Sequence, residues 1–383
     1  MRIAFICTSL QPGRDGVGDY TRQLAAACAE RGHECRLFAI NDRHLATSIE
    51  DDDGCVRFAS TEPWPNRIAA LASALRDFAP DWVSWQIVAY GFDPKGLMPA
   101  AAAPLAALSG GWQTHAMLHE LWLGLPAGES VRTRLVGAWQ RHRLLAFLRR
   151  LAPQRVHTSN ETYQRVLRRC QWPAQVLPLF GNIPIAPPAA PSPLAELAPR
   201  LSPAPRTIGV MFGTLHAQWR ARETFSFLRA AAADTHRSIS LVTLGHGGPQ
   251  QDAILAPVRA EFRDIPVLTL GAASPTRISQ ILQSADFGLS SHPWALVEKS
   301  GSTVAMLEHG LPVLVPRDEW RLRGDAASTA SWSPLLRPLK GFAPSEFSTW
   351  LDHRHAPAPR LPHVVDAFLA ALGDPVHAPA SAA

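Results

Sequence analysis

A chain of 383 residues, 46% hydrophobic and 18% charged, has the composition of a globular protein, and its length favours two domains that each bury a core. Its formal net charge of +5 is too small for a protein that coats nucleic acid, and no Lys/Arg block with interleaved aromatic residues predicts contact with RNA or DNA. Five widely spaced cysteines without a CxxC pair favour a reducing cytoplasm, and no window approaches the ~18 apolar residues of a membrane span.

The first half of the chain alternates strand and helix patterns, beginning with a strand, an amphipathic helix that ends at Gly32 and a second strand. A long basic helix and a further strand–helix pair follow. The expected strands begin near residues 2, 33, 81, 116, 155 and 175, and the expected helices cover residues 16–32, 64–78, 131–151 and 161–170.

A segment of different composition then interrupts the alternation, because residues 183–205 are rich in Pro and Ala and have little periodicity. Strands and helices alternate again from residue 206 to residue 316, which predicts two parallel-sheet α/β domains with right-handed crossovers. The predicted boundaries are 1–182 for an N-terminal Rossmann-like domain, 183–205 for a linker, 206–345 for a C-terminal Rossmann-like domain, 346–375 for a helical segment that packs back on the N-terminal domain, and 376–383 for a disordered tail.

Lys299 is one of only three lysines in the chain, and it stands directly before a Ser-Gly-Ser-Thr run that opens a predicted helix. Ser300–Thr303 should therefore form a helix N-terminus at the carboxyl end of a parallel strand, where unpaired N–H groups and the helix dipole attract anions. Gly301 would let the backbone approach an oxygen, and the lysine adds a mobile positive charge suited to phosphate. The alternative is simple N-capping by Ser300 or Ser302, with Lys299 solvated.

A second glycine-rich loop lies between the first strand and the first helix, where Gly13, Gly16 and Gly18 could turn backbone amides toward a phosphate or a sugar. A dinucleotide fingerprint, with Asp42 on the ribose, is the rival interpretation. It is disfavoured because Thr21 occupies the position of the third glycine and because the loop is too long for a tight turn. The two loops could face one cleft and hold one diphosphate between them.

The stretch DGVGDYTRQLAAACAERGHE resembles the opening of bacterial retaining glycosyltransferases of family 4, which have the GT-B fold of two Rossmann-like domains facing a central cleft. Further matches are HTSN, LPLFGNIP, VTLGHGGPQ and the run from GAASPTRISQILQSADFGLSS to MLEHGLPV. The resemblance implies a nucleotide-sugar donor in the cleft, a hydroxyl acceptor such as a glycan or glycolipid, and no cofactor or metal.

The resemblance also implies site residues. His119 matches a histidine near the reacting sugar, and Glu298 lies close to a glutamate that touches the donor sugar. Lys299 is added to these catalytic candidates by our own inference, because it would stabilise the leaving diphosphate. The donor-binding candidates are Gly16, Gly18, Gly213, Arg220, Gly245, Ser300, Gly301, Ser302 and Thr303.

The chain departs from the family pattern at two places. The second glutamate of the family falls on Ala305 or Met306, while Glu308 faces elsewhere on its helix. The Arg and Lys that the family places after the first strand of its second domain are replaced by Thr214 and Trp219, with Arg220 one residue off. Two further hypotheses therefore stay open: a nucleotide-sugar-binding protein without transfer activity, and a sugar-nucleotide epimerase of the same fold.

Gln86, Tyr90 and Trp122 are candidate groups on the acceptor side, although ordinary packing is the default interpretation for each. His119 and the adjacent Glu120 could form an acid/base pair, or the histidine could simply pack at the end of a strand. The acidic run at residues 50–53 is interpreted as a solvated turn rather than a metal site.

The helix expected at residues 131–151 carries six arginines, set opposite Leu135, Trp139, Leu144 and Leu148. Such a helix could rest on an anionic membrane, bring a lipid-linked acceptor to the cleft and place this cytoplasmic protein at the inner membrane surface. The alternative is an ordinary surface helix with its apolar stripe in the core.

Overall fold

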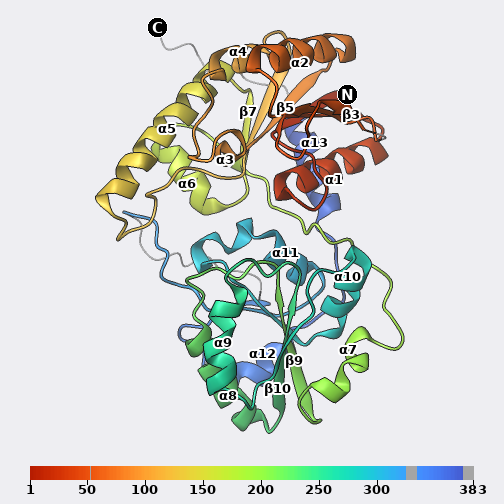
Figure 1. Cartoon of the computed structure of the whole chain (residues 1–383), viewed down its shortest axis with the longest axis vertical. Coiled ribbons are helices and arrows are strands. Elements are labelled where there is room, and N and C mark those ends of the chain that lie inside the picture. Colours follow the sequence, from red (N-terminus) through yellow and green to blue (C-terminus); the bar gives the residue numbers. More distant parts are fainter. Residues whose placement is uncertain (52, 325–333, 374–383) are drawn as a thin grey trace. The chain divides into compact units, whose positions relative to one another are not determined.

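The computed structural model describes residues 1–51, 53–324 and 334–373. The chain forms two compact units (Figure 1). Among the described residues, the first consists of Met1–Pro178 and Leu361–Gly373, and the second is Leu179–Arg360.

The first unit is built on an eight-stranded sheet in which every neighbouring pair is parallel except β3–β4. Its strands lie in the order β3 (Ile49–Glu50), β4 (Val56–Ala59), β2 (Glu34–Asp42), β1 (Arg2–Cys7), β5 (Trp82–Ile87), β6 (Gln113–Leu118), β7 (Arg155–Thr158) and β8 (Gln175–Val176). Its helices are α1 (Gly16–Glu30), α2 (Trp64–Phe78), α3 (Ala89–Phe92), α4 (Ala102–Ala107), α5 (Val131–Leu151), α6 (Glu161–Arg169) and α13 (Leu361–Gly373).

The last helix, α13, belongs to the first unit because its apolar side packs on the sheet. The Phe368 ring lies 5.8 Å from the ring of Phe5 on β1 and 5.2 Å from that of His115 on β6. Asp366 on the same helix forms an ion pair with Arg31 at 2.7 Å. Burial of Phe368 supplies most of the attraction, since an exposed ion pair contributes at most about 1 kcal/mol.

The second unit is built on a six-stranded sheet whose neighbours are all parallel. Its strands lie in the order β11 (Val267–Thr269), β10 (Ser238–Leu244), β9 (Arg206–Phe212), β12 (Phe287–Leu289), β13 (Val313–Val315) and β14 (Leu336–Pro338). Numbered within this unit, the order is 3-2-1-4-5-6, which is that of the Rossmann fold. Its helical segments are α7 (Pro193–Glu196), η1 (Ala198–Arg200), α8 (Ala221–Thr235), α9 (Gln251–Glu261), α10 (Pro275–Ser284), η2 (Trp294–Lys299), α11 (Gly301–Glu308), η3 (Pro344–Glu346) and α12 (Phe347–Leu351).

Two separate apolar cores cover the two faces of the second sheet, because neighbouring residues of a strand point to opposite faces. On β9, Val210 enters the core that includes residues of α7, α10 and α11, whereas Met211 enters the core that includes residues of α8, α9 and α12. Figure 1 shows α7 and α10 on one side of this sheet and α8 and α9 on the other.

The boundaries of the two units differ from those expected from composition. The expected linker, residues 183–205, lies within the second unit, where Leu194 and Leu201 enter its core. Helix α12 also belongs to the second unit through Phe347 and Trp350, so only α13 returns to the first unit. In the sequence, the many Pro and Ala residues around Leu194 and Leu201 give no periodic pattern that would mark these two leucines as core residues. The expected tail, residues 376–383, lies outside the described residues.

Candidate functional site

The carboxyl ends of β9 and β12 mark the place where the strand order of the second sheet reverses, since the chain proceeds from β9 toward one edge and returns to the other side of it. Open α/β sheets bind ligands at such a switch point. Gly213 directly follows β9, and Ser290 directly follows β12. The predicted phosphate site therefore has the location that the topology favours.

Gly213 brings the end of β9 into close approach with the start of α11. Its φ is +87°, in the left-handed region, and a Cβ on this residue would lie only 3.2 Å from the Cβ of Ser302. Its N–H donates to the Leu244 carbonyl oxygen at 2.9 Å, which places Gly245 beside it at the end of β10. The structure thus assembles the donor-binding candidates Gly213, Gly245 and Ser302.

Ser300 is the N-cap of α11, and its Oγ accepts a hydrogen bond from the Thr303 N–H at 3.2 Å. The N-capping interpretation of Ser300 is therefore confirmed. Hydroxyl contacts continue from it, with Ser300 Oγ to Ser302 Oγ at 3.1 Å and Ser290 Oγ to Thr303 Oγ1 at 2.8 Å. Capping leaves the first helical amides, those of Gly301 and Ser302, as the ones that an anion would meet.

The backbone of Gly301 is uncrowded, because a Cβ on this residue would meet no atom of the described residues within 4 Å. An atom of a ligand can therefore approach the Gly301 backbone closely. The dipole of the eight-residue helix α11 adds partial positive charge at the same place.

His292 is a residue of this site that the sequence interpretation missed. Its backbone N–H donates to Ser290 Oγ at 3.2 Å, which ties it to the hydroxyl contacts of α11. The ring atom Nδ1 is buried and has no hydrogen-bond partner within the described part of the chain. A buried polar atom without a hydrogen-bond partner lowers the stability of the folded chain unless a ligand supplies that partner. A histidine just beyond a buried strand, in ADFGLSSHP, was the available signal.

Positive groups gather around His292. Burial, the Lys299 ammonium and the Arg317 guanidinium lower the pKa of His292 to about 4, in that order of effect. The imidazole is therefore neutral at pH 7. Lys299 and Glu298 lie on η2, directly before the N-cap, and both are partly buried. The predicted lysine is thus close enough to His292 to act on it electrostatically.

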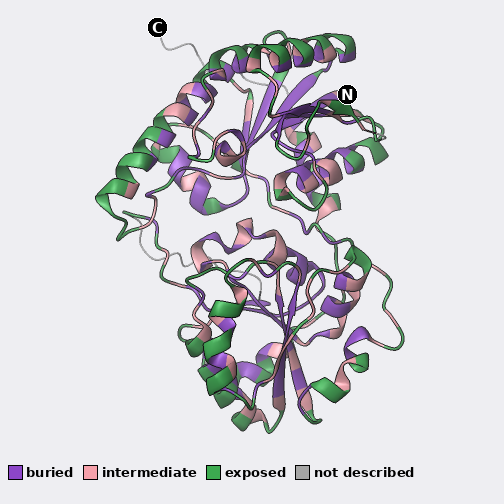
Figure 2. Cartoon of the chain, viewed as in Figure 1, coloured by how far each residue is buried: buried purple, intermediate pink, exposed green. Residues whose placement is uncertain are grey.

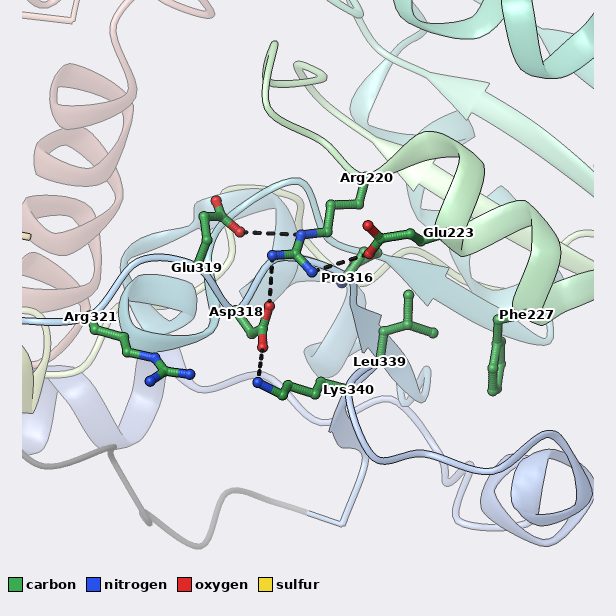
Figure 3. A pocket seen from close by; sticks show the side chains of 9 residues that line it. All are labelled: Arg220, Glu223, Phe227, Pro316, Asp318, Glu319, Arg321, Leu339 and Lys340. Atoms are coloured by element: carbon green, nitrogen blue, oxygen red, sulfur yellow. Dashed lines mark hydrogen bonds and ion pairs between the residues drawn. The ribbon is translucent and has the colours of Figure 1, made fainter. Parts of the chain in front are cut away.

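Arg220 lies in a separate pocket of about 600 Å³ near the carboxyl end of β13 (Figure 3). Its guanidinium is held by three carboxylates, those of Asp318 at 3.0 Å, Glu223 at 3.1 Å and Glu319 at 3.7 Å. Lys340 adds an ion pair to Asp318 at 3.3 Å. These carboxylates already neutralise the positive charge of Arg220, which disfavours the predicted contact of Arg220 with a pyrophosphate.

The absence of the second glutamate of the family has a structural reason. Ala305 is fully buried, and a Cβ on Gly181 would lie 2.8 Å from the Ala305 Cα. Met306 is fully buried against Gly288. Neither position has room for a carboxylate that could face a ribose.

Glu308 instead binds the backbone of the segments that enter and leave the second unit. Its Oε1 accepts the Arg360 N–H at 2.9 Å, and its carboxylate also accepts the Gly181 N–H. Burial raises the pKa of this carboxyl group. Glu308 therefore faces away from the helix start, as expected, and its contacts are structural.

In the first unit, a carboxylate of the glycine-rich loop accepts hydrogen bonds from backbone N–H groups of the same loop. Asp15 is the N-cap of α1, and its Oδ1 accepts the N–H groups of Val17 and Gly18, both at 2.9 Å. Gly18 is required for packing, since a Cβ there would lie 2.5 Å from the Ser9 carbonyl oxygen. Gly16 has open space around it. The Gly18 amide is therefore engaged within the chain, which disfavours its predicted contact with donor phosphate.

Asp42, the acid of the rival dinucleotide interpretation, is fully buried. It forms an ion pair with Arg57 at 2.9 Å and accepts the N–H groups of Leu10 and His44. These contacts hold its pKa low against the opposing effect of burial. A carboxylate engaged in this way has a structural role.

His119 follows the end of β6, and Gln86 on the neighbouring strand β5 holds its ring. His119 Nε2 lies 2.9 Å from Gln86 Oε1, and because an amide oxygen only accepts, Nε2 carries the hydrogen. The rings of Tyr20 and His119 pack in a T-shaped arrangement with 5.0 Å between their centroids. Gln86, the candidate group on the acceptor side, is 2% exposed and orients His119 through this hydrogen bond.

A chain of buried hydrogen bonds continues from Gln86 across the centre of the first sheet. Gln86 Nε2 donates to Ser84 Oγ at 2.9 Å, Ser84 Oγ lies 2.8 Å from His115 Nδ1, and His115 Nε2 lies 2.9 Å from His157 Nδ1. Burial lowers the pKa of His115 well below its usual value and that of His157 to about 4. Both imidazoles are therefore neutral at pH 7.

The remaining acceptor candidates are engaged in the first unit. The Tyr90 hydroxyl accepts a hydrogen bond from Gln140 Nε2 at 3.1 Å, and Trp122 is 9% exposed. Packing, the default interpretation, thus accounts for Trp122.

Among residues 1–51, 53–324 and 334–373, no group of three or more His, Cys, Asp or Glu residues is arranged to hold a metal ion. Across the same ranges, every helix is too short or too polar to cross a membrane.

Solved structures with low sequence identity share this fold. UDP-GlcNAc 2-epimerase from Methanocaldococcus jannaschii aligns with a TM-score of 0.52 at 9% identity, over 97% of this chain and 99% of that one. HepE from Anabaena, in complex with UDP and glucose, aligns with a TM-score of 0.57 at 13% identity, over 98% and 100%. A glycosyltransferase from Rickettsia africae aligns with a TM-score of 0.55 at 13% identity, over 97% and 93%.

The fold is GT-B. This confirms the expected class of two Rossmann-like units with parallel-dominated sheets. At these identities the likeness concerns the fold alone. No protein-family profile matches the chain, and a search of curated proteins finds no relative.

Proposed function

We propose that the protein is a glycosyltransferase that moves a sugar from a nucleotide-sugar donor to a hydroxyl acceptor, with retention at the anomeric carbon and without a metal ion. The observation that carries the proposal is the helix start at the switch point of the second sheet. There Gly213, Gly301 and Ser302 present close backbone and hydroxyl groups. Beside them lie Lys299 and His292, whose Nδ1 has no hydrogen-bond partner among the residues that the structure describes.

Physical chemistry links this arrangement to transfer. When the bond between the anomeric carbon and the phosphate oxygen breaks, negative charge grows on the leaving diphosphate. Fixed N–H groups, the α11 dipole and the Lys299 ammonium would stabilise that charge. His292 would donate a hydrogen bond from Nδ1–H to a phosphate oxygen, and its buried Nδ1 would then have a hydrogen-bond partner. Several positive groups acting together would take the place of a metal.

His119 is the proposed contribution of the first unit to the reaction. Gln86 fixes its ring and leaves Nδ1 as the basic nitrogen when the imidazole is neutral. Glu298 is retained in the proposal as the group that touches the donor sugar, because it directly precedes Lys299.

The proposed donor is a uridine diphosphate sugar, because structures that share the fold include HepE with UDP-glucose and an epimerase from Neisseria meningitidis with UDP-GlcNAc. The same likeness favours a second candidate, a sugar-nucleotide epimerase. Ala305 is one of the two positions on which the second glutamate of the resembled glycosyltransferase family falls. Its lack of a carboxylate favours a third candidate, a donor-binding protein without transfer activity.

One experiment separates the three functions. The purified chain is incubated in EDTA with UDP-glucose, UDP-GlcNAc and their GDP, ADP and dTDP counterparts, with and without a panel of glycan and glycolipid acceptors. NMR of the products is expected to show an acceptor glycoside with the anomeric configuration of the donor. An epimerised donor in the absence of acceptor would establish the epimerase, and donor binding without any product would establish the binding protein.

A further inference from the structure

The first half of α5 exposes apolar side chains that a globular protein ordinarily buries. Val131 is 68% exposed, Leu135 67% and Trp139 55%, and Leu123 and Val136 are exposed beside them. Five of the seven large exposed apolar side chains in the described residues therefore belong to this one place. Figure 2 shows the exposure along α5, the yellow helix of Figure 1.

The spacing of these residues makes a continuous stripe. Val131, Leu135 and Trp139 are four residues apart and so lie on one side of the helix. Leu123 joins them because the loop before α5 packs its backbone directly against Gly137, where a side chain would collide with the Leu123 carbonyl. We call Leu123, Val131, Leu135, Val136 and Trp139 the α5 face.

The second half of the same helix is anchored, which corrects the single stripe expected from the sequence. Leu144 and Leu148 are 2% and 0% exposed and pack in the core, whereas Leu135 and Trp139 point outward. The Arg143 guanidinium donates to the Met98 and Pro99 carbonyl oxygens. The α5 face is thus held rigidly by the rest of its own helix.

The charge around the α5 face has one sign. Residues 131–151 contain six arginines and no aspartate or glutamate, and the nearest acid before them is Glu129. Arg132, Arg134 and Arg141 are exposed, and within the described ranges no ion pair neutralises them. Arginines near the surface of an anionic bilayer are attracted to it.

We infer that the α5 face docks on an anionic lipid surface. A stripe of Val, Leu and Trp flanked by arginine matches the boundary between lipid head groups and acyl chains, where apolar side chains enter and arginine meets phosphate. A second copy of the chain would bring like charges together at the same face, which opposes self-association. This inference does not depend on the proposed reaction.

The test is co-sedimentation of the full chain with vesicles of phosphatidylcholine alone and of phosphatidylcholine with an equal amount of phosphatidylglycerol. Wild-type protein should sediment only with the anionic vesicles, and higher salt should weaken this binding. Leu135→Gln with Trp139→Gln should lower the vesicle affinity at least tenfold. Arg132→Gln with Arg134→Gln and Arg141→Gln should lower it as well.

Two matched controls carry the same kinds of change elsewhere. Ile49→Gln removes an exposed apolar side chain outside the α5 face, and Arg222→Gln removes an exposed arginine of α8. Both should bind vesicles as the wild type does, and all variants should keep its melting temperature because the changed side chains are exposed.

Three outcomes would overturn the inference. The first is a wild-type chain that does not bind anionic vesicles, and the second is vesicle binding that the α5 variants leave unchanged. The third is a wild-type dimer in solution that Leu135→Gln with Trp139→Gln dissociates, because the α5 face would then be an interface between copies.

Discussion

Gly213 and Ser302 approach so closely that a Cβ on the glycine would lie 3.2 Å from the serine Cβ. Gly213→Ala should therefore crowd the start of α11 and lower the affinity for a nucleoside diphosphate about tenfold, equivalent to about 1.4 kcal/mol. Gly271→Ala is the matched control, because Gly271 has a φ of +70° but open space around it. Both should lose similar stability, and isothermal titration should show weaker nucleotide binding only for Gly213→Ala.

Stability should fall as the pH is lowered from 6.5 toward 4. Burial holds the pKa values of His157 and His292 at about 4 in the folded chain, and it lowers that of His115 well below its usual value. The unfolded chain, with histidine pKa values near 6.5, then binds more protons in this window, so acid favours unfolding. For His157 and His292, whose folded pKa values are about 4, the loss should be on the order of 2 kcal/mol each between pH 7.5 and pH 5.

Urea unfolding at the two pH values measures this loss. His157→Gln should make the pH dependence shallower, whereas His142→Gln should leave it unchanged because His142 is exposed on α5. An equal free energy of unfolding at pH 7.5 and pH 5 would contradict the assignment of neutral, buried imidazoles.

Gln86 should control the ionisation of His119. Gln86→Leu removes the acceptor of His119 Nε2–H and the donor to Ser84, which should cost about 1–3 kcal/mol of stability. Gln86→Glu places a carboxylate at the same atom and should raise the His119 pKa. NMR titration of the His119 ring measures the shift, and the pH profile of transfer should move with it. A rate profile unchanged in Gln86→Glu would remove His119 from the reaction.

Glu308 should stabilise the second unit through the backbone it binds. Glu308→Ala leaves the N–H groups of Gly181 and Arg360 without an acceptor, at about 1–3 kcal/mol each. Glu308→Gln keeps one oxygen as an acceptor and should lose less. Chemical unfolding compares the two, and equal losses would mean that the hydrogen bonds to the two segments contribute nothing measurable.

The fold could be predicted from the sequence because strand and helix periods alternate cleanly in both halves. The helix expected at residues 64–78 is α2 with the same bounds, and the Ser-Gly-Ser-Thr run opens α11 as expected. The extent of the second unit could not be predicted in this way. Leu194, Leu201 and Phe347 anchor it, and only tertiary packing distinguishes such residues from apolar residues in a linker.

The site could be predicted only where one local segment defines it. The candidates at residues 299–303 lie on contiguous chain at the start of α11, so their spacing was informative. His292 and the role of Gln86 depend on neighbours from other segments, namely Ser290 and His119. The exposure of Trp139 depends on which half of α5 the rest of the unit covers, which the helical period does not specify.

The most direct test of the central claim is isothermal titration of the purified chain with UDP, GDP, ADP and dTDP in EDTA, repeated on Lys299→Ala and on Lys95→Ala. Lys95 is an exposed lysine of the first unit and serves as the matched control. We expect UDP to bind the wild type and Lys95→Ala equally, and to bind Lys299→Ala at least tenfold more weakly. Binding of none of the four, or equal binding by Lys299→Ala, would contradict a diphosphate site at the start of α11.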